Sequence, residues 1–147
     1  MPNIPRHSQH APHAHIEANI SPTTFNPQVA GVAIIKGLNY LKSRWHWSGT
    51  KIAKTLHIPS NTLNTWLKNK VVPLSNSNLQ PDIQAIIHLL AIHRSLEAMF
   101  ENPDHQRIWL TTFHPEINHV PEKLMSESFQ GLIFIRQYLD YVRGRGA

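Results

Sequence analysis

Histidine is the residue type in this chain that invites a chemical role. The chain contains eleven His and no Cys, which excludes disulfides, thiolate zinc sites, iron–sulfur clusters and cysteine nucleophiles. Four histidines, His7, His10, His13 and His15, lie close together near the N-terminus. A metal site needs a scaffold that fixes its ligands, and the prolines among these histidines oppose a helix there. We therefore expect no bound metal.

A second candidate is the pair Arg107 and His114, whose spacing resembles the Arg and His signature of helical RNA-cleaving domains. Pro115 biases His114 away from helix, so the helix that carries Arg107 should end before His114, and the two side chains need not converge. The sequence has no Gly-rich phosphate loop, no nucleophile elbow and no His-Glu-x-x-His motif. We predict no catalytic residues, no cofactor and no enzymatic activity.

Positive charge is concentrated in one stretch of the chain. Residues 31–78 contain seven Lys and Arg and no Asp or Glu, whereas residues 79–147 contain six basic and eight acidic residues. A run of cations without anions attracts a polyanion such as nucleic acid. The formal net charge of +5 understates this asymmetry.

Length and hydropathy indicate the number of domains and the cellular location to expect. A chain of 147 residues, 41% of them hydrophobic, suits one compact domain or two small ones. No apolar run approaches the roughly 20 residues of a membrane helix, and the N-terminus lacks the apolar stretch of a secretory signal. We expect a cytoplasmic protein.

The elements that position these residues are expected to be helices alone, which makes the fold class all-α. Residues 1–28 hold five of the eleven prolines and no apolar periodicity, so a disordered arm is predicted there. Residues 74–80 read as a linker. Apolar spacing and capping residues predict helices from Val29 to about Trp45, from Ser48 through Leu56, from Ser60 up to Val71, from Asp82 to Phe100, from Asn102 and Pro103 through Leu110, and from about Glu127 to Val142. Phe113 to Pro121 is predicted as a loop, and residues 143–147 as a polar tail.

Two of these helices carry patterns that predict packing. In the first, the apolar stripe is expected to be Val29, Ala33, Ile34, Leu38 and Leu41. The helix from Asp82 to Phe100 is apolar over most of its circumference, so either neighbouring helices or a second chain must bury it. We take this as favouring a homodimer.

The helices on either side of His57 have the size and spacing of a helix-turn-helix. Ala53 lies where the two helices must approach closely, and a shared core of Ile52, Leu56, Ile58, Leu63 and Trp66 is expected. His57 occupies the turn position that usually holds Gly in the left-handed conformation. The alternative is a small helical domain with a solvated basic face, and we favour DNA binding.

The exposed face of the second helix would meet the major groove. Asn pairs bidentately with adenine and Thr contacts the thymine methyl group, while Lys binds phosphate. The predicted DNA-binding residues are Lys51, Ser60, Asn61, Thr62, Asn64, Thr65 and Lys68. Lys54 and Lys70 are further candidates for phosphate contacts.

The second half carries a more specific pattern. It contains an Arg-x-Trp-Leu helix, two loop prolines, a glycine near the start of the last helix, and a following Arg-x-Tyr-Leu. The residues are Arg107, Ile108, Trp109, Leu110, Thr111, Thr112, Pro115, Pro121, Leu124, Gly131, Leu132, Arg136, Tyr138 and Leu139. With the preceding helix-turn-helix, this order resembles the Xre/MbcA/ParS antitoxin family over about residues 30–147, most specifically in its C-terminal toxin-binding module.

The resemblance implies an antitoxin that sequesters a RES-type toxin and represses its own operon. Such a toxin is an enzyme that consumes NAD or transfers ADP-ribose from it. Together with the predicted arm (1–28), the resemblance divides the chain into a helix-turn-helix domain (29–78) and a toxin-binding and dimerisation domain (79–147). The expected toxin-binding residues are Arg107, Trp109, Arg136, Tyr138, Tyr141, Arg143 and Arg145. Phe113 and His114 depart from the Pro-Asn that is common before the loop proline, and Asn118 and His119 stand where Gly is common.

Several residue roles stay open on the sequence alone. Trp109 fits a core position and a partner surface equally well. Phe134, Tyr138 and Tyr141 form a stripe that on residue type is more often core, and Arg107 is expected to pair with an acid of the long helix. Arg143 and Arg145, between glycines, fit either a frayed terminus or a segment that enters the toxin's active site. The alternative function is a stand-alone helix-turn-helix regulator with a helical dimerisation domain.

Overall fold

The computed structural model describes residues 26–74 and 81–146, in which seven helices and no strands are found. The predicted all-α class is confirmed. Most of the predicted arm and of the predicted linker lies outside the described residues, although residues 27 and 28 already belong to the first helix. None of the helices in the described segments is long and apolar enough to cross a membrane.

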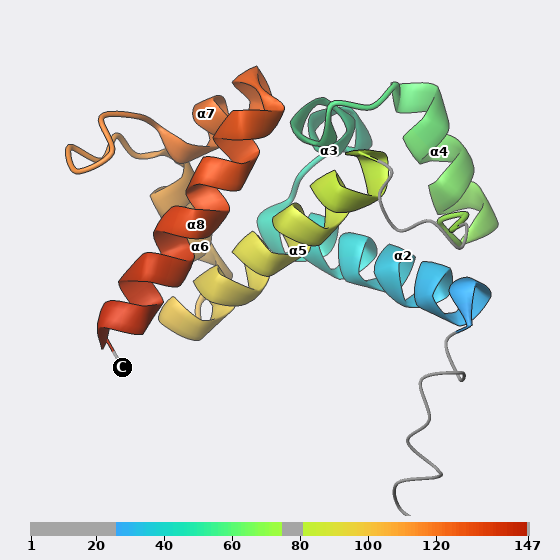
Figure 1. The fold of residues 1–147 in the computed structure, drawn as a ribbon, viewed down its shortest axis with the longest axis horizontal. Helices are drawn as coiled ribbons and strands as arrows, with labels where there is room; N and C mark the ends of the chain where they lie inside the picture. Colours follow the sequence, from blue (N-terminus) through green and yellow to red (C-terminus); the bar gives the residue numbers. More distant parts are fainter. Residues whose placement is uncertain (1–25, 75–80, 147) are drawn as a thin grey trace, which may run out of the picture.

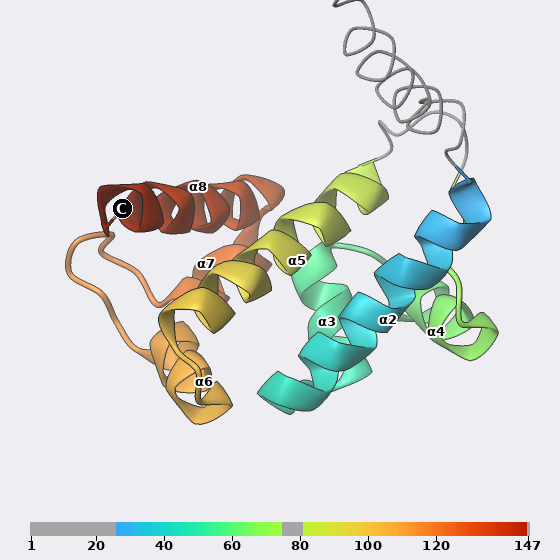
Figure 2. The ribbon, with the colours of Figure 1, turned by 90° about the horizontal axis from the view of Figure 1, so that it is seen from below.

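The helices are α2 (Pro27–Trp45), α3 (Gly49–Leu56), α4 (Ser60–Asn69), α5 (Pro81–Met99), α6 (Pro103–Thr111), α7 (Pro121–Glu127) and α8 (Phe129–Gly146). Helix α5 runs through the middle of the molecule (Figures 1 and 2) and contacts α2, α3, α6 and α8. Helix α3 packs on α4 on one side and on α7 on the other. The two halves of the sequence are thereby joined through α3 and α5.

Capping residues set the helix ends that the sequence predicted. Ser48 Oγ accepts a hydrogen bond from Lys51 N at 3.1 Å, and Asn102 Oδ1 accepts one from Asp104 N at 2.9 Å. Both bonds satisfy backbone donors that have no partner inside the helix. His57 ends α3 in the left-handed conformation, with φ of 60°, as its place in the turn predicted. His46 and Lys70 end α2 and α4 in the same way.

One continuous core connects both halves of the sequence. It includes Trp45 from α2, Leu56 from α3, Ile86 and Leu96 from α5, and Leu139 from α8. Helix α5 is covered by helices of its own chain, although Ile87 remains 45% exposed. Its apolar circumference therefore does not by itself require a second chain, and the homodimer stays a prediction.

Some details of the helices were predicted wrongly. In α2, Val29 and Ala33 are exposed, and the buried stripe instead contains Ile35 and Trp45. Helix α7 was missed, because seven residues are too few to show a period. The predicted loop before it contains an isolated bridge between His114 and His119.

The last helix also continues farther than expected. Helix α8 extends to Gly146, beyond the predicted end at Val142. The segment predicted as a polar tail is therefore helical from residue 143 to residue 146.

Two glycines allow close approach between segments. A Cβ at Gly31 would lie 2.1 Å from Val72 O, and one at Gly131 would lie 2.0 Å from Leu124 O. Any side chain at Gly131 would push α8 away from α7. Gly131, near the start of the last helix, is thus needed for packing.

Candidate functional site

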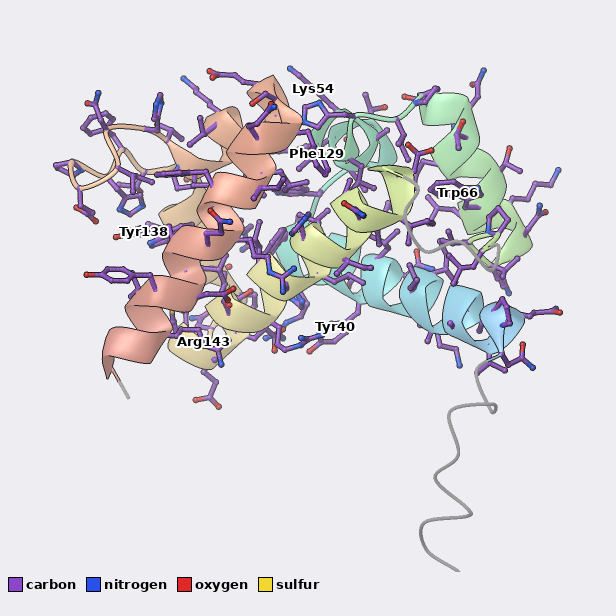
Figure 3. All side chains as sticks on the ribbon, viewed as in Figure 1. Tyr40, Lys54, Trp66, Phe129, Tyr138 and Arg143 are labelled. Carbon is purple, nitrogen blue, oxygen red and sulfur yellow. The ribbon has the colours of Figure 1, made fainter. Side chains whose placement is uncertain are left out.

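The face of α4 that was predicted to meet DNA is open to solvent. Leu63 and Trp66 are buried against the core, which directs the intervening side chains outward; Trp66 is labelled in Figure 3. The side chains of Ser60, Asn61, Asn64, Thr65 and Lys68 are exposed, and that of Thr62 is half-buried. Thr65 Oγ1 donates a hydrogen bond to Asn61 O at 2.9 Å. The structure thus brings six of the seven predicted DNA-binding residues onto one helix.

The seventh, Lys51, has a different environment. Its Nζ lies 2.9 Å from Glu122 Oε2 of α7 and 4.9 Å from the ring centroid of Trp47. Its side chain is 40% exposed, so a phosphate would have to share it with the carboxylate. Glu122 could not be predicted from the sequence, because nothing in the local pattern links α7 to α3.

A polar cleft of about 340 Å³ lies at this contact between α3 and α7. It is lined by Ser48, Thr50, Lys51, Lys54, Thr55, Glu122, Lys123 and Ser126. A second contact joins the same helices, because His57 Nε2 lies 3.0 Å from Met125 O. Three lysines and a single carboxylate give the cleft a positive balance.

Helix α6 carries two of the predicted toxin-binding residues. Arg107 pairs with Asp104 of its own helix, and its Nη1 donates a hydrogen bond to Arg44 O at 2.8 Å. The expected pairing of Arg107 with an acid of the long helix is wrong, because Arg107 pairs with Asp104, and Glu97 of α5 pairs with Arg44 at 3.2 Å.

Trp109 is half-buried, packs against the core, and stacks at 4.8 Å on the ring of His114. His114 Nε2 lies 2.8 Å from Trp109 O, so the ring of His114 is directed at α6 and has a partner different from those of Arg107. An apolar pocket of about 300 Å³ lies beside Trp109, lined also by Phe100 and Ile108. Ile108 is 59% exposed at its rim.

Helix α8 carries the remaining predicted residues. Arg136 Nη1 lies 3.1 Å from His88 Nδ1, and Arg143 Nη1 donates to Ser95 Oγ at 3.1 Å; both partners belong to α5. Tyr138 Oη donates to Glu116 Oε1 at 3.4 Å (Figure 3). The side chain of Arg145, in the last turn of α8, lies outside the described part of the chain.

The aromatic stripe of α8 is not all core. Phe134 and Tyr141 are 44% and 59% exposed, so these two residues lie at the surface rather than in the core, while Tyr138 is half-buried. Phe113, in the loop after α6, is 52% exposed. Large apolar side chains at the surface are typical of interaction sites when they gather in one region.

A buried polar cluster links the helices beneath these surfaces. Trp45 Nε1 donates a hydrogen bond to Gln106 Oε1 at 2.9 Å, and both side chains are buried. His93 Nε2 lies 3.1 Å from Glu97 Oε1, and the His93 ring packs against Tyr40 and Trp45.

Two histidines have perturbed acidity. Burial lowers the pKa of His93, with Arg44 adding to the effect and Glu97 opposing it. The pKa of His88 is lowered by burial and by Arg136. Both histidines are therefore neutral near pH 7. Across residues 26–74 and 81–146, no three His, Asp or Glu side chains come together as metal ligands.

These features define a class of protein: an all-helical chain with a polar, basic two-helix face and an attached module that exposes large apolar side chains. Residues 95–145 match the model of the antitoxin Xre/MbcA/ParS C-terminal toxin-binding domain. The resemblance in the sequence is confirmed over this segment, which supports an antitoxin role and implies a toxin as partner. No curated protein matches the chain.

Proposed function

We propose that the chain is the antitoxin of a type II toxin–antitoxin system, that it neutralises a RES-type toxin that consumes NAD or transfers ADP-ribose, and that it represses its own operon. The observation that carries this proposal is the match of residues 95–145 to the toxin-binding domain. An inhibitor of this kind needs no chemistry of its own, because covering the toxin's active site is sufficient.

The exposed apolar side chains of the matched segment support a protein partner. Ile108 on α6 borders the apolar pocket beside Trp109, and Phe134 and Tyr141 project from α8. Exposed aromatic and aliphatic side chains of this size are the anchors that protein interfaces bury. The toxin would cover these residues, with Arg136, Tyr138, Arg143 and Arg145 on the same final helix.

The exposed polar face of α4 supports DNA binding. Asn61, Asn64 and Thr65 are exposed on the face that would meet base edges, and the stretch of residues 31–78 has no acidic residue to repel phosphate. We infer that α3 and α4 act as the helix-turn-helix that binds the operator. A homodimer would place two such units on a palindromic site, and the mass of the purified chain by light scattering tests that state.

Co-expression with the product of the adjacent gene tests the antitoxin function. The neighbour alone should arrest growth and deplete NAD, and this chain should restore both and co-purify with it. Ile108→Glu should weaken the complex, because the toxin would have to bury a carboxylate. Val29→Glu on α2 is the matched control, since Val29 is 64% exposed and lies outside the matched segment.

The stand-alone regulator predicts a different result. In that case the neighbour would be harmless, nothing would co-purify, and DNA binding would persist in the isolated chain. If the complexes of Ile108→Glu and Val29→Glu are equally stable, the toxin partner is retained, but α6 does not belong to the interface.

The end of α8 carries a separate part of the proposal. Because residues 143–146 are helical and Arg143 contacts Ser95, entry of an extended tail into the toxin would require the last turn to unwind. Deletion of residues 143–147 should weaken inhibition if the tail enters the active site. Full neutralisation by the truncated chain would exclude that role.

A further inference from the structure

We propose that α7, although it belongs to the toxin-binding segment, also binds DNA, with Lys123 contacting the phosphate backbone beside the site of α3 and α4. The inference rests on the proposed DNA binding of α4 and adds a second contact region to it. The partner is the sugar–phosphate backbone of duplex DNA, read without regard to sequence.

The three helices form one continuous surface. A Cβ at Gly49 would lie 3.7 Å from Asn64 Oδ1, so the start of α3 lies against the exposed face of α4. Ser48 and Thr50, on either side of Gly49, line the polar cleft that reaches Lys123 and Ser126 of α7. Figure 1 shows α7, α3 and α4 along the same upper edge of the molecule, and Lys54 projects from this edge in Figure 3.

The chemistry of the cleft suits phosphate. Lys, Ser and Thr side chains are among those that bind the DNA backbone, and the cleft gathers three lysines with the hydroxyls of Ser48 and Thr50. The hydroxyl of Ser126 donates instead to Lys123 O of the same helix at 3.1 Å. Glu122 neutralises Lys51 through their 2.9 Å ion pair. Lys54 and Lys123 are exposed, and neither has an ion-pair partner in the segments that the structure describes. Their charges remain available to a polyanion.

The position of the apolar surface favours DNA over the toxin as the occupant of this cleft. The large exposed side chains of the matched segment are Ile108 and Phe113 at and after α6, and Phe134 and Tyr141 on α8. None of them lines the cleft. A protein interface centred on those residues would not need Lys123, whereas DNA lying across α4 would reach the neighbouring edge of α3 and α7.

The salt dependence of DNA binding tests the proposal. The full chain is titrated against a labelled duplex from the region upstream of its gene and against a scrambled duplex of the same composition. The variants are Lys123→Gln and Lys54→Gln, with Lys36→Gln, an exposed lysine of α2 outside the cleft, as the matched control. Thermal unfolding of each variant verifies that it folds like the wild type.

Loss of one phosphate contact should reduce the slope of log K against log salt by about 0.9, so the affinity advantage of the wild type over Lys123→Gln should shrink about 3.5-fold between about 50 and 200 mM salt. Lys54→Gln should reduce the salt slope as Lys123→Gln does, and it should do so on both duplexes. Lys36→Gln should keep the salt slope of the wild type.

Each other result overturns the proposal in a distinct way. If Lys54→Gln lowers the slope and Lys123→Gln does not, α4 and α3 bind DNA without α7, and the proposed function stands. If Lys123→Gln disrupts the toxin complex and leaves the salt slope unchanged, the cleft belongs to the toxin. If the wild-type chain does not bind either duplex, both this inference and the proposed repression fail.

Discussion

At the scale of single residues, Gly131 has a packing role that can be measured directly. The Cβ of Gly131→Ala would lie 2.0 Å from Leu124 O, a backbone atom that can move only with α7. We expect the free energy of unfolding to fall by about 1–3 kcal/mol, the usual cost of overpacking. Denaturant unfolding measures this change.

Gly144→Ala is the control, because a Cβ at Gly144, in the same helix, meets nothing within 4 Å. Removing a helical glycine there should stabilise the protein by up to about 1 kcal/mol. Equal effects of the two substitutions would show that α8 does not need its close approach to α7.

His93 gives a prediction on pH. Burial lowers its pKa in the folded protein from the ordinary value of 6.5, so below that pH the unfolded chain takes up a proton that the folded chain does not. The contribution of neutral, buried His93 to the free energy of unfolding is therefore largest above about pH 6.5. It falls as the pH drops toward the lowered pKa of the folded state, by at most about 1.4 kcal/mol per pH unit.

Urea unfolding between about pH 7.5 and 5.5 measures this loss. His93→Gln should lower the stability at neutral pH, because the ring packs against Tyr40 and Trp45, but it should flatten the decline in acid. His88, whose pKa is also lowered, leaves part of the decline in place. An unchanged pH dependence in His93→Gln would contradict the account of its environment.

At the scale of helices, local chemistry explains which elements the sequence predicted well. Ser48, Asn102 and His57 each form a cap or turn with partners a few residues away, so their roles can be recognised without the fold. Helix α7 has too few residues for a period, although Pro121 at its first position and Glu122 in its first turn are start signals.

Contacts between distant helices could not be predicted in the same way. The pairing of Lys51 with Glu122, and the choice of Ile35 over Ala33 as the buried residue of α2, depend on which helix lies opposite. The continuation of α8 through Gly144 also runs against the low helix propensity of glycine. The exposure of most residues in the predicted DNA-binding face could be predicted from the sequence, because exposure on α4 follows from the burial of Leu63 and Trp66 alone.

The exposed face of α4 makes a prediction about specificity. Asn64→Ala should weaken binding to the operator duplex by about 1–3 kcal/mol if Asn64 pairs with a base edge. Binding to the scrambled duplex and the salt slope should both remain unchanged, since no phosphate contact is removed. Fluorescence anisotropy on the two duplexes distinguishes this result from an equal loss on both, which would assign Asn64 to the backbone.

At the scale of the whole molecule, the single core predicts cooperative unfolding. Helices α2 and α3 bury Trp45, Ile52 and Leu56 in the same cluster as α5, α6 and α8. We expect one thermal transition for the full chain. A fragment of residues 26–78 should show little helix by circular dichroism, because it lacks the partners of those side chains.

A fragment with full helical content and a sharp transition would show instead that the first half folds alone. The predicted boundary between residues 78 and 79 would then separate two independent domains. The fragment of residues 79–147 provides the reciprocal measurement.

The hydrogen bond between the buried Trp45 indole and Gln106 has a consequence for hybrid proteins. Consider an antitoxin assembled from the first half of this chain and the second half of a relative. Its buried Trp45 indole N–H would have no hydrogen-bond acceptor unless the relative also has Gln, or another acceptor, at the position of Gln106. A buried donor without a partner costs about 1–3 kcal/mol. Exchange of toxin specificity by recombination between relatives should therefore succeed most readily when this pair of residues is transferred together.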